Sequence, residues 1–214
     1  MLAFDKETVD RVTGGTQFTG DLIVPGMATG KVMRSPYAHA KIIRIDTSRA
    51  EAMPGVFGVL TSADFKGIKP FYGLAYRDQP ILAMEKARYE GEPVVAVAAV
   101  DEATAAEAIA SIEIEYELLP AAVTLDQALA DTAPLVHSER LEKTGHYPDV
   151  AEIQPIDGTN ICHNAVSEIG DVEKGMAEAD RVFENTFICP PVNHYTMEPL
   201  ATTADYQGDH IKVW

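Results

Sequence analysis

The sequence predicts a mixed α/β (α+β) fold, and residues 88–122 carry most of that prediction. Residues 93–100 are a continuous run of mainly Val and Ala, which is typical of a strand buried on both faces. Asp101 follows as a helix cap, because its carboxylate can accept hydrogen bonds from the free amides of a first turn. From residue 112 the apolar period becomes two, which indicates a strand with one buried and one solvated face.

The predicted helix over 102–111 presents small side chains at three- to four-residue spacing, so it can lie close to a sheet. The residues of this face are Ala105, Ala106, Ile109 and Ala110. The strand after it alternates apolar residues with Glu113, Glu115 and Glu117. A row of carboxylates on one side of a strand is a solvated surface, so we assign these acids no acid–base chemistry.

Shorter elements are expected on both sides of this block. Turn residues and apolar runs predict strands over 30–35, 41–46 and 56–61, with helical turns at 49–53 and 62–65. Residues 66–87 are predicted to be irregular. The aromatic side chains there could line a binding groove, but we favour the alternative that they pack on the core and anchor the loop. Beyond a short helix at 124–130, we expect a helix capped by Asp171, strands over 182–189 and 197–206, a turn at 207–209 and a final strand.

The order of these elements suggests two domains. We expect a lead-in over 1–14, a first domain over 15–130, a linker arm over 131–160 and the start of a second domain over 161–214. The arm is polar and carries several Pro and Gly residues. Half a hairpin at the end of the second domain suggests that this domain is cut short.

Composition excludes several classes of protein. The 214 residues contain 33 acidic and 17 basic side chains, for a net charge of −16, which argues against nucleic-acid binding. The longest apolar run, 94–100, is too short to span a membrane. The first residues show no basic region followed by an apolar stretch, so we expect a cytoplasmic protein.

The residues by themselves predict no complete active site. None of the six histidines has a partner at metal-ligand spacing; His194 and Glu198 would lie about 13 Å apart along a strand, too far to share an ion. Two cysteines, Cys162 and Cys189, cannot supply the four thiolates of an iron–sulfur cluster. We therefore assign no catalytic, cofactor-binding or metal-binding residue to this chain.

One short turn offers a candidate surface for a partner protein. The stretch RSPYAHA over 34–40 places charged and aromatic groups on a tight turn, and its candidate contact residues are Arg34, Ser35, Tyr37 and His39. Turn chemistry set by Pro36 explains the same pattern equally well.

Five stretches, in order, resemble the large molybdenum-binding subunit of the xanthine dehydrogenase and aldehyde oxidase family. They cover residues 15–64, DQPILA at 78–83, the block at 88–122, GDVEKGMAEADRVFENTF at 170–187 and HYTMEPLATTADY at 194–206. The first and third are similar to the family's α/β hammerhead domain. The last two resemble the opening of its molybdopterin-binding domain.

The resemblance implies a molybdenum hydroxylase, which inserts a water-derived oxygen into a C–H bond of an aldehyde or an N-heterocycle such as a purine. It also implies a molybdenum–molybdopterin cofactor, with [2Fe–2S] clusters and FAD on partner chains or domains. The family's catalytic residues lie in segments beyond residue 214, so we expect this chain to be inactive by itself. It would need the remainder of the molybdopterin-binding subunit, an iron–sulfur subunit and a flavin subunit.

Two other hypotheses remain open. The chain could be a non-catalytic binding or assembly module that docks an iron–sulfur partner. Less favoured is a degenerate fragment without function. The substrate, the oligomeric state and the origin of the chain, as a natural split subunit or a truncated piece, do not follow from the sequence.

Overall fold

A computed structural model describes residues 6–138, 141–144, 153–190 and 192–214. The chain divides into two compact units, one formed by residues 28–170 and the other by residues 1–27 together with 171–214. Among the described residues, no helix is both long and apolar enough to cross a bilayer. The domain boundaries expected from the sequence stay a prediction.

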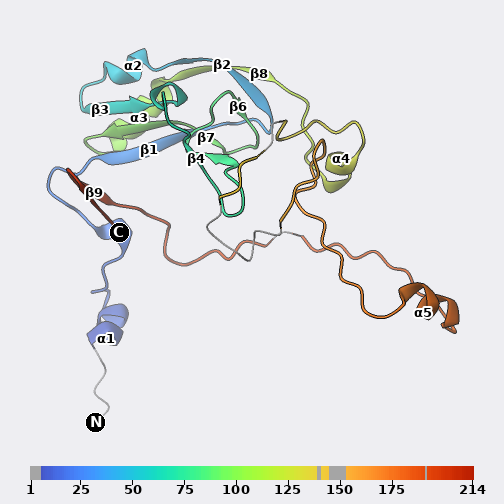
Figure 1. The fold of residues 1–214 in the computed structure, drawn as a ribbon. Coiled ribbons are helices and arrows are strands. Elements are labelled where there is room, and N and C mark those ends of the chain that lie inside the picture. Colours follow the sequence, from blue (N-terminus) through green and yellow to red (C-terminus); the bar gives the residue numbers. More distant parts are fainter. Residues whose placement is uncertain (1–5, 139–140, 145–152, 191) are drawn as a thin grey trace, which may run out of the picture. The chain divides into compact units, whose positions relative to one another are not determined.

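A three-stranded antiparallel sheet holds the core of the larger unit. Its order is β1 (Thr29–Arg34), β7 (Pro93–Ala99) and β3 (Val56–Leu60), so β7 is central (Figure 1). Val94, Val95 and Val97 on β7 are almost completely buried. The prediction of a strand buried on both faces is therefore confirmed, although both of its neighbours run antiparallel.

A second antiparallel sheet has the order β6 (Lys86–Ala87), β2 (Ala40–Asp46) and β8 (Glu113–Leu118). The acidic side chains of β8 are exposed, as predicted, and the register places Lys41 opposite Glu117 and Arg44 opposite Glu115. Opposite charges on facing strands stabilise the pairing modestly. The acidic row therefore contributes to solvation and strand pairing.

Helix α3 (Glu102–Ser111) connects the central strand of the first sheet to the edge strand of the second (Figure 1). Asp101 Oδ1 accepts a hydrogen bond from the amide of Thr104 at 2.8 Å, which confirms the predicted cap. Ala105 and Ala108 are fully buried, whereas Ala110, expected on the buried face, is exposed. The buried face is thus turned slightly from the predicted one. The helix packs on the first sheet beside α2 (Ser48–Glu51).

Short elements complete the larger unit. They are the 3₁₀ turn η2 (Ser62–Asp64), β4 (Phe71–Tyr72), β5 (Gln79–Pro80) and α4 (Leu125–Leu129). Strands β4 and β5 pair within a region that the sequence predicts as irregular. The described part of the linker arm packs on this loop, because Arg77 donates to the carbonyl of Glu142 at 2.8 Å and Thr144 to that of Ala75 at 3.0 Å.

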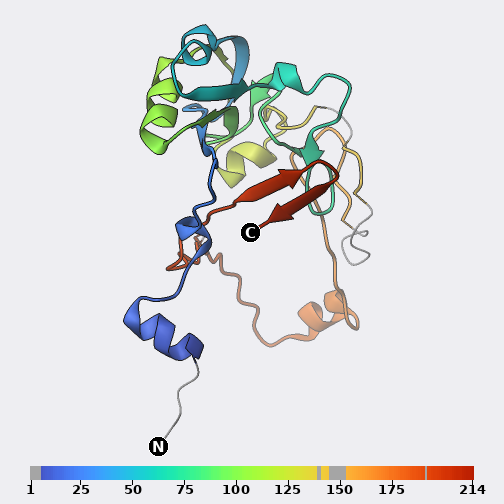
Figure 2. The same cartoon turned by 90° about the vertical axis from the view of Figure 1, so that its left-hand side faces the viewer.

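The smaller unit contains α1 (Lys6–Thr13), the 3₁₀ turn η1 (Thr19–Asp21), α5 (Val172–Glu178) and the hairpin β9 (Ala204–Gln207) and β10 (His210–Val213) (Figure 2). The predicted turn and final strand are confirmed, but the hairpin is complete, with all four residues of β10 paired to β9, so the expectation of half a hairpin is wrong. The predicted cap is also confirmed, because Asp171 Oδ1 accepts from the amide of Lys174 at 2.9 Å. The lead-in expected over 1–14 is not an irregular segment at residues 6–13. A helix forms there, with ion pairs one turn apart that the sequence pattern did not reveal.

The predicted strand over 182–189 is also wrong, and the strand expected over 197–206 shrinks to β9. A strand needs a neighbour to satisfy its amides and carbonyls. In the described part of the chain, no backbone hydrogen bond reaches residues 182–189. The apolar side chains of this stretch are exposed, so the residue pattern is that of a strand, but no neighbouring strand is found within the ranges that the structure describes.

Candidate functional site

The turn between β1 and β2 is fastened to the loop that precedes β7. The amide of Ser35 donates to the carbonyl of Glu92 at 2.9 Å, and the amide of Gly91 donates back to the carbonyl of Ser35 at 2.8 Å. Arg34 Nη1 adds a bond of 2.8 Å to the Gly91 carbonyl. Residues far apart in the sequence thus form one rigid corner of the larger unit.

Glu92 is the buried charge of this corner, with only 1% of its surface exposed. Its carboxylate accepts a hydrogen bond from the amide of Arg88. Burial raises the pKa of Glu92 above its ordinary value, and the Arg88 amide and guanidinium oppose that rise. The carboxylate of Glu92 therefore organises the turn of residues 88–92. The sequence does not predict this role, because nothing in the surrounding motif indicates that Glu92 is buried.

The four candidate contact residues have different surroundings. Ser35 is 2% exposed and its hydroxyl bonds Tyr37 within the turn, so the expectation that it lies on the surface is wrong. Arg34 and Tyr37 are exposed. The Tyr37 ring meets Tyr116 edge to face, with centroids 5.2 Å apart. His39 is half-buried and donates from Nδ1 to the carbonyl of Pro120 at 2.6 Å. A partner contact at Arg34, Tyr37 and His39 stays a prediction.

A small pocket of about 320 Å³ opens beside this corner. His39, Arg88, Tyr89 and Glu90 form its polar part, and the remaining walls come mainly from Ala and Val. Burial raises the pKa of the Tyr89 hydroxyl, and the nearby Glu92 carboxylate raises it further. At neutral pH Tyr89 therefore offers a hydroxyl donor to this surface.

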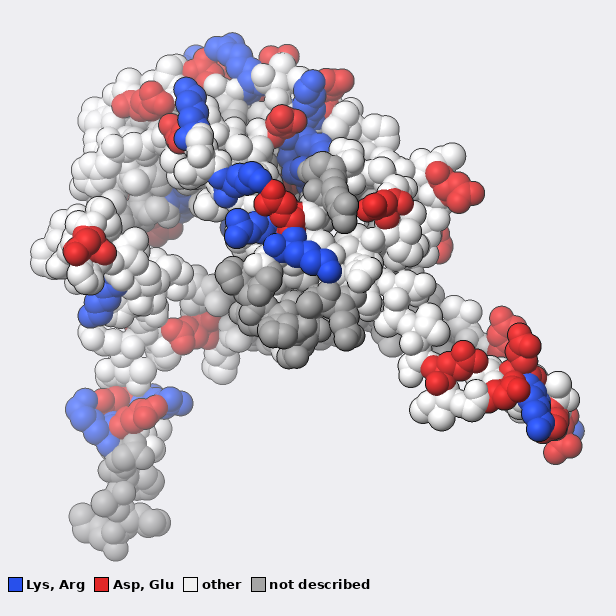
Figure 3. Space-filling view, in the orientation of Figure 1, with Lys and Arg blue, Asp and Glu red and all other residues white. Residues whose placement is uncertain are grey.

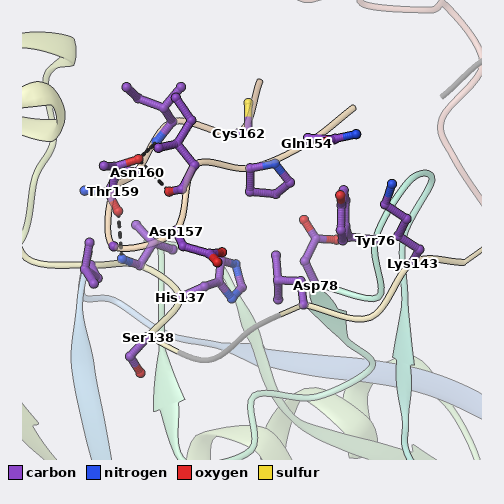
Figure 4. A pocket seen from close by; sticks show the side chains of 17 residues that line it. Tyr76, Asp78, His137, Ser138, Lys143, Gln154, Asp157, Thr159, Asn160 and Cys162 are labelled. Carbon is purple, nitrogen blue, oxygen red and sulfur yellow. Dashed lines mark hydrogen bonds between the residues drawn. The ribbon is translucent and has the colours of Figure 1, made fainter. Parts of the chain in front are cut away.

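A larger pocket of about 1050 Å³ lies where the linker arm meets the loop of residues 73–78. Figure 4 shows Tyr76, Asp78 and Lys143 on one side and Thr159 and Asn160 on the other. Its volume is at the upper end of the range for small-molecule sites. The residue pattern of the arm is that of a connection, so this pocket was not expected.

Asn160 builds one wall of the larger pocket. Its Nδ2 donates to the carbonyls of Pro134 at 3.1 Å and Ala128 at 3.3 Å, and its Oδ1 accepts from the amide of Val136 at 3.0 Å. On the other side, Tyr76 donates its hydroxyl to the carbonyl of Ile153 at 2.8 Å. The polar groups of Asn160 and Tyr76 therefore hold the walls in place.

Gly73 determines the shape of the loop beneath this pocket. Its φ is +154°, and a Cβ added there would overlap the carbonyl oxygen of Tyr76. We expect Gly73→Ala to lower the free energy of unfolding by about 2 kcal/mol. Gly67→Ala is the control, because its φ is +81° but no atom lies within 4 Å of the added Cβ, and it should cost about 1 kcal/mol. Equal losses in urea denaturation would contradict this account of Gly73.

Charged groups of both signs are mixed on the molecular surface. Figure 3 shows basic and acidic side chains next to one another on the face turned to the viewer. Lys69, for example, forms an ion pair with Glu142 of the arm. Among the described residues, no three His, Cys, Asp or Glu side chains come together at metal-binding distance. Cys162 and Cys189 are both exposed, and neither forms a disulfide.

The described residues do not by themselves form a site that fits a pterin cofactor. Such a group needs a concave site with converging polar groups. Residues 182–190 are extended and exposed, and none of them lines either pocket. The larger pocket includes residues 154–162, but its charged lining is mixed, with Asp78 and Asp157 against Lys143, so it offers no net positive charge to an anionic cofactor. These residues by themselves supply no chemical step at molybdenum.

Residues 13–120 match the family model of the aldehyde oxidase and xanthine dehydrogenase a/b hammerhead domain. The chain belongs to this family. Residues 153–214 match a second model, that of a molybdopterin cofactor-binding domain. The resemblance seen in the sequence motifs is therefore confirmed, together with the hammerhead fold.

Two relatives from bacteria extend this assignment. A probable xanthine dehydrogenase polypeptide of Bacillus subtilis is 38% identical over 93% of this chain, which covers 24% of that protein. The carbon monoxide dehydrogenase large chain of Afipia carboxidovorans is 38% identical over 96% of this chain and 25% of its own length. The chain thus spans about a quarter of the length of these two relatives.

Solved structures of related enzymes contain the same fold over part of their chains. The Cu,Mo-CO dehydrogenase superposes on 62% of this chain with a TM-score of 0.58 at 38% identity, over 17% of its own chain. The aldehyde oxidoreductase of Desulfovibrio gigas gives a TM-score of 0.56 at 31% identity, over 62% of this chain and 16% of its own. The chain therefore shares the sequence and fold of part of a molybdenum hydroxylase large subunit.

Proposed function

We propose that this chain acts as the N-terminal part of the large subunit of a molybdenum hydroxylase. One observation carries the proposal: a hammerhead-domain match is followed by a molybdopterin-domain match in one chain, in the order shared with relatives that are 38% identical over nearly its whole length. The reaction class is the oxidative hydroxylation of an aldehyde or N-heterocycle, with water as the oxygen source.

The chain's own residues supply a scaffold. A molybdenum–pterin cofactor, held by the rest of the large subunit, would supply the redox chemistry, with [2Fe–2S] clusters and FAD on partner chains or domains. The corner built by Ser35, Gly91 and Glu92 presents Arg34, Tyr37 and His39 for contact with such a partner. We place the assembled enzyme in the cytoplasm.

An exchange of segments tests this proposal. In the Afipia carbon monoxide dehydrogenase large chain, the matching segment is replaced by residues 1–214, and the chimera is produced with that enzyme's other subunits. We expect the chimera to bind molybdenum and oxidise carbon monoxide. A large chain that lacks the segment is the control and should do neither.

The isolated chain is measured beside the chimera. We expect it to bind no molybdenum and to oxidise no aldehyde or N-heterocycle. Turnover by the isolated chain would show that the claimed need for the rest of the large subunit is wrong. A folded chimera that stays free of molybdenum would favour the alternative of a non-catalytic module that docks an iron–sulfur partner.

A further inference from the structure

Residues 182–189, VFENTFIC, are an extended and exposed stretch rich in apolar side chains. Phe183, Phe187 and Ile188 are 80%, 85% and 89% exposed, and Val182 is 59% exposed. Isolated apolar residues on a surface are ordinary, but a run of this density marks an interaction site. No backbone hydrogen bond reaches this stretch from the described residues, so its amides and carbonyls are available to pair with another strand.

The order of the side chains tells what kind of partner fits. In an extended chain alternate residues share a face, so Phe183 and Phe187 lie on one face and Val182 and Ile188 on the other. Apolar residues on both faces are typical of a strand with layers packed above and below. Pro190 follows at once and removes a donor, which ends the pairing there.

We propose that residues 182–189 form a β-strand only when they add to strands of the remaining molybdopterin-binding domain. The proposal rests on the proposed function. The partner follows from the comparison: this stretch lies inside the segment that matches the molybdopterin-domain model, while the chain covers only a quarter of the length of the Bacillus and Afipia relatives. Strand addition satisfies the free amides and covers both apolar faces in one event.

Amide hydrogen exchange in the chimera described above tests the strand. In the isolated chain we expect residues 182–189 to exchange at nearly the rate of an unstructured peptide. In the chimera their exchange should slow by about 100-fold or more, because paired strands open only through larger unfolding events. Residues 94–99 of β7 serve as an internal reference, since this strand is paired in the larger unit and should be protected in both proteins.

A matched pair of variants tests the apolar faces. Phe187→Asp in the chimera should lower the yield of soluble, molybdenum-loaded protein by about ten-fold or more, because it buries an unpaired carboxylate. Phe57→Asp is the control: Phe57 is 64% exposed on β3, in the larger unit, and its replacement should change the yield by about two-fold or less. The same exchange experiment on the isolated chain should not distinguish Phe187→Asp from the wild type.

The outcomes separate this inference from the proposed function. An active chimera in which residues 182–189 exchange as fast as in the isolated chain would overturn the strand proposal alone. A chimera that protects these residues but binds no molybdenum would support the strand and overturn the proposed function. Equal loss of yield from Phe187→Asp and Phe57→Asp would also contradict the strand proposal.

Discussion

Replacing Glu92 with alanine should lower the free energy of unfolding of residues 28–170 by about 3 kcal/mol, the combined effect of an unsatisfied buried donor and an empty site. Glu92 is 1% exposed and accepts a hydrogen bond from the amide of Arg88. Its own carbonyl holds Ser35, so disorder in this loop would spread to the turn of residues 34–39.

Urea denaturation measures this loss, with Glu90→Ala as the matched control. Glu90 lies two residues away, is exposed and should contribute within about 0.5 kcal/mol. Glu92→Gln keeps an acceptor for Arg88 and should lose less than the alanine variant. An alanine variant as stable as the wild type would contradict the organising role of this carboxylate.

The pH dependence of stability gives a second view of Glu92. Burial raises its pKa in the folded protein above the ordinary value of 4.5. Folding therefore favours the protonated side chain of Glu92. The stability that this contributes to the protein is fully present below the pKa of Glu92 in the unfolded chain, and it is lost as the pH rises through the pKa of Glu92 in the folded protein. The wild type should accordingly lose stability relative to Glu92→Gln as the pH rises from below 4.5. A constant difference between the two proteins would contradict this assignment.

Replacing Ala108 with leucine should cost about 3 kcal/mol, the upper end of the usual cost of overfilling a packed core. Ala108 is fully buried where α3 lies on the first sheet, in one cluster with Val94, Val95 and Val97. A larger side chain there would push the helix away from the sheet.

The control for this variant is Ala110→Leu, on the exposed side of the same helix. Leucine and alanine have similar helix propensities, so the control should stay within about 0.5 kcal/mol of the wild type. Thermal unfolding followed by circular dichroism compares the two variants. If both were equally stable, α3 would not pack on the sheet through its small residues.

Elements that are determined by interactions between residues close in the sequence were predictable from the sequence. Strand β7, the Asp101 cap and the exposed acidic side of β8 all follow from apolar periodicity and capping chemistry within a few residues. The assignment of the two halves of residues 88–122 to different sheets was not predictable, because strand pairing joins residues that are distant in the sequence.

Features that depend on distant partners were missed or wrongly placed. The burial of Ser35 and Glu92 arises from contacts between residues more than fifty positions apart. The larger pocket depends on Asn160, whose side-chain amide donates hydrogen bonds to the carbonyls of Ala128 and Pro134 and so holds the arm in place. No local sequence motif predicts these hydrogen bonds. Conversely, residues 182–189 carry a strand pattern with no partner among the described residues, so periodicity alone overstated their order.

The molybdenum content of the purified chimera, measured by elemental analysis beside that of the isolated chain, tests the central claim most directly. We expect close to one molybdenum atom per chimeric large chain and none in the isolated chain. A folded chimera without molybdenum, or an isolated chain that binds it in stoichiometric amount, would contradict the claim that these residues are one part of a larger molybdenum hydroxylase subunit.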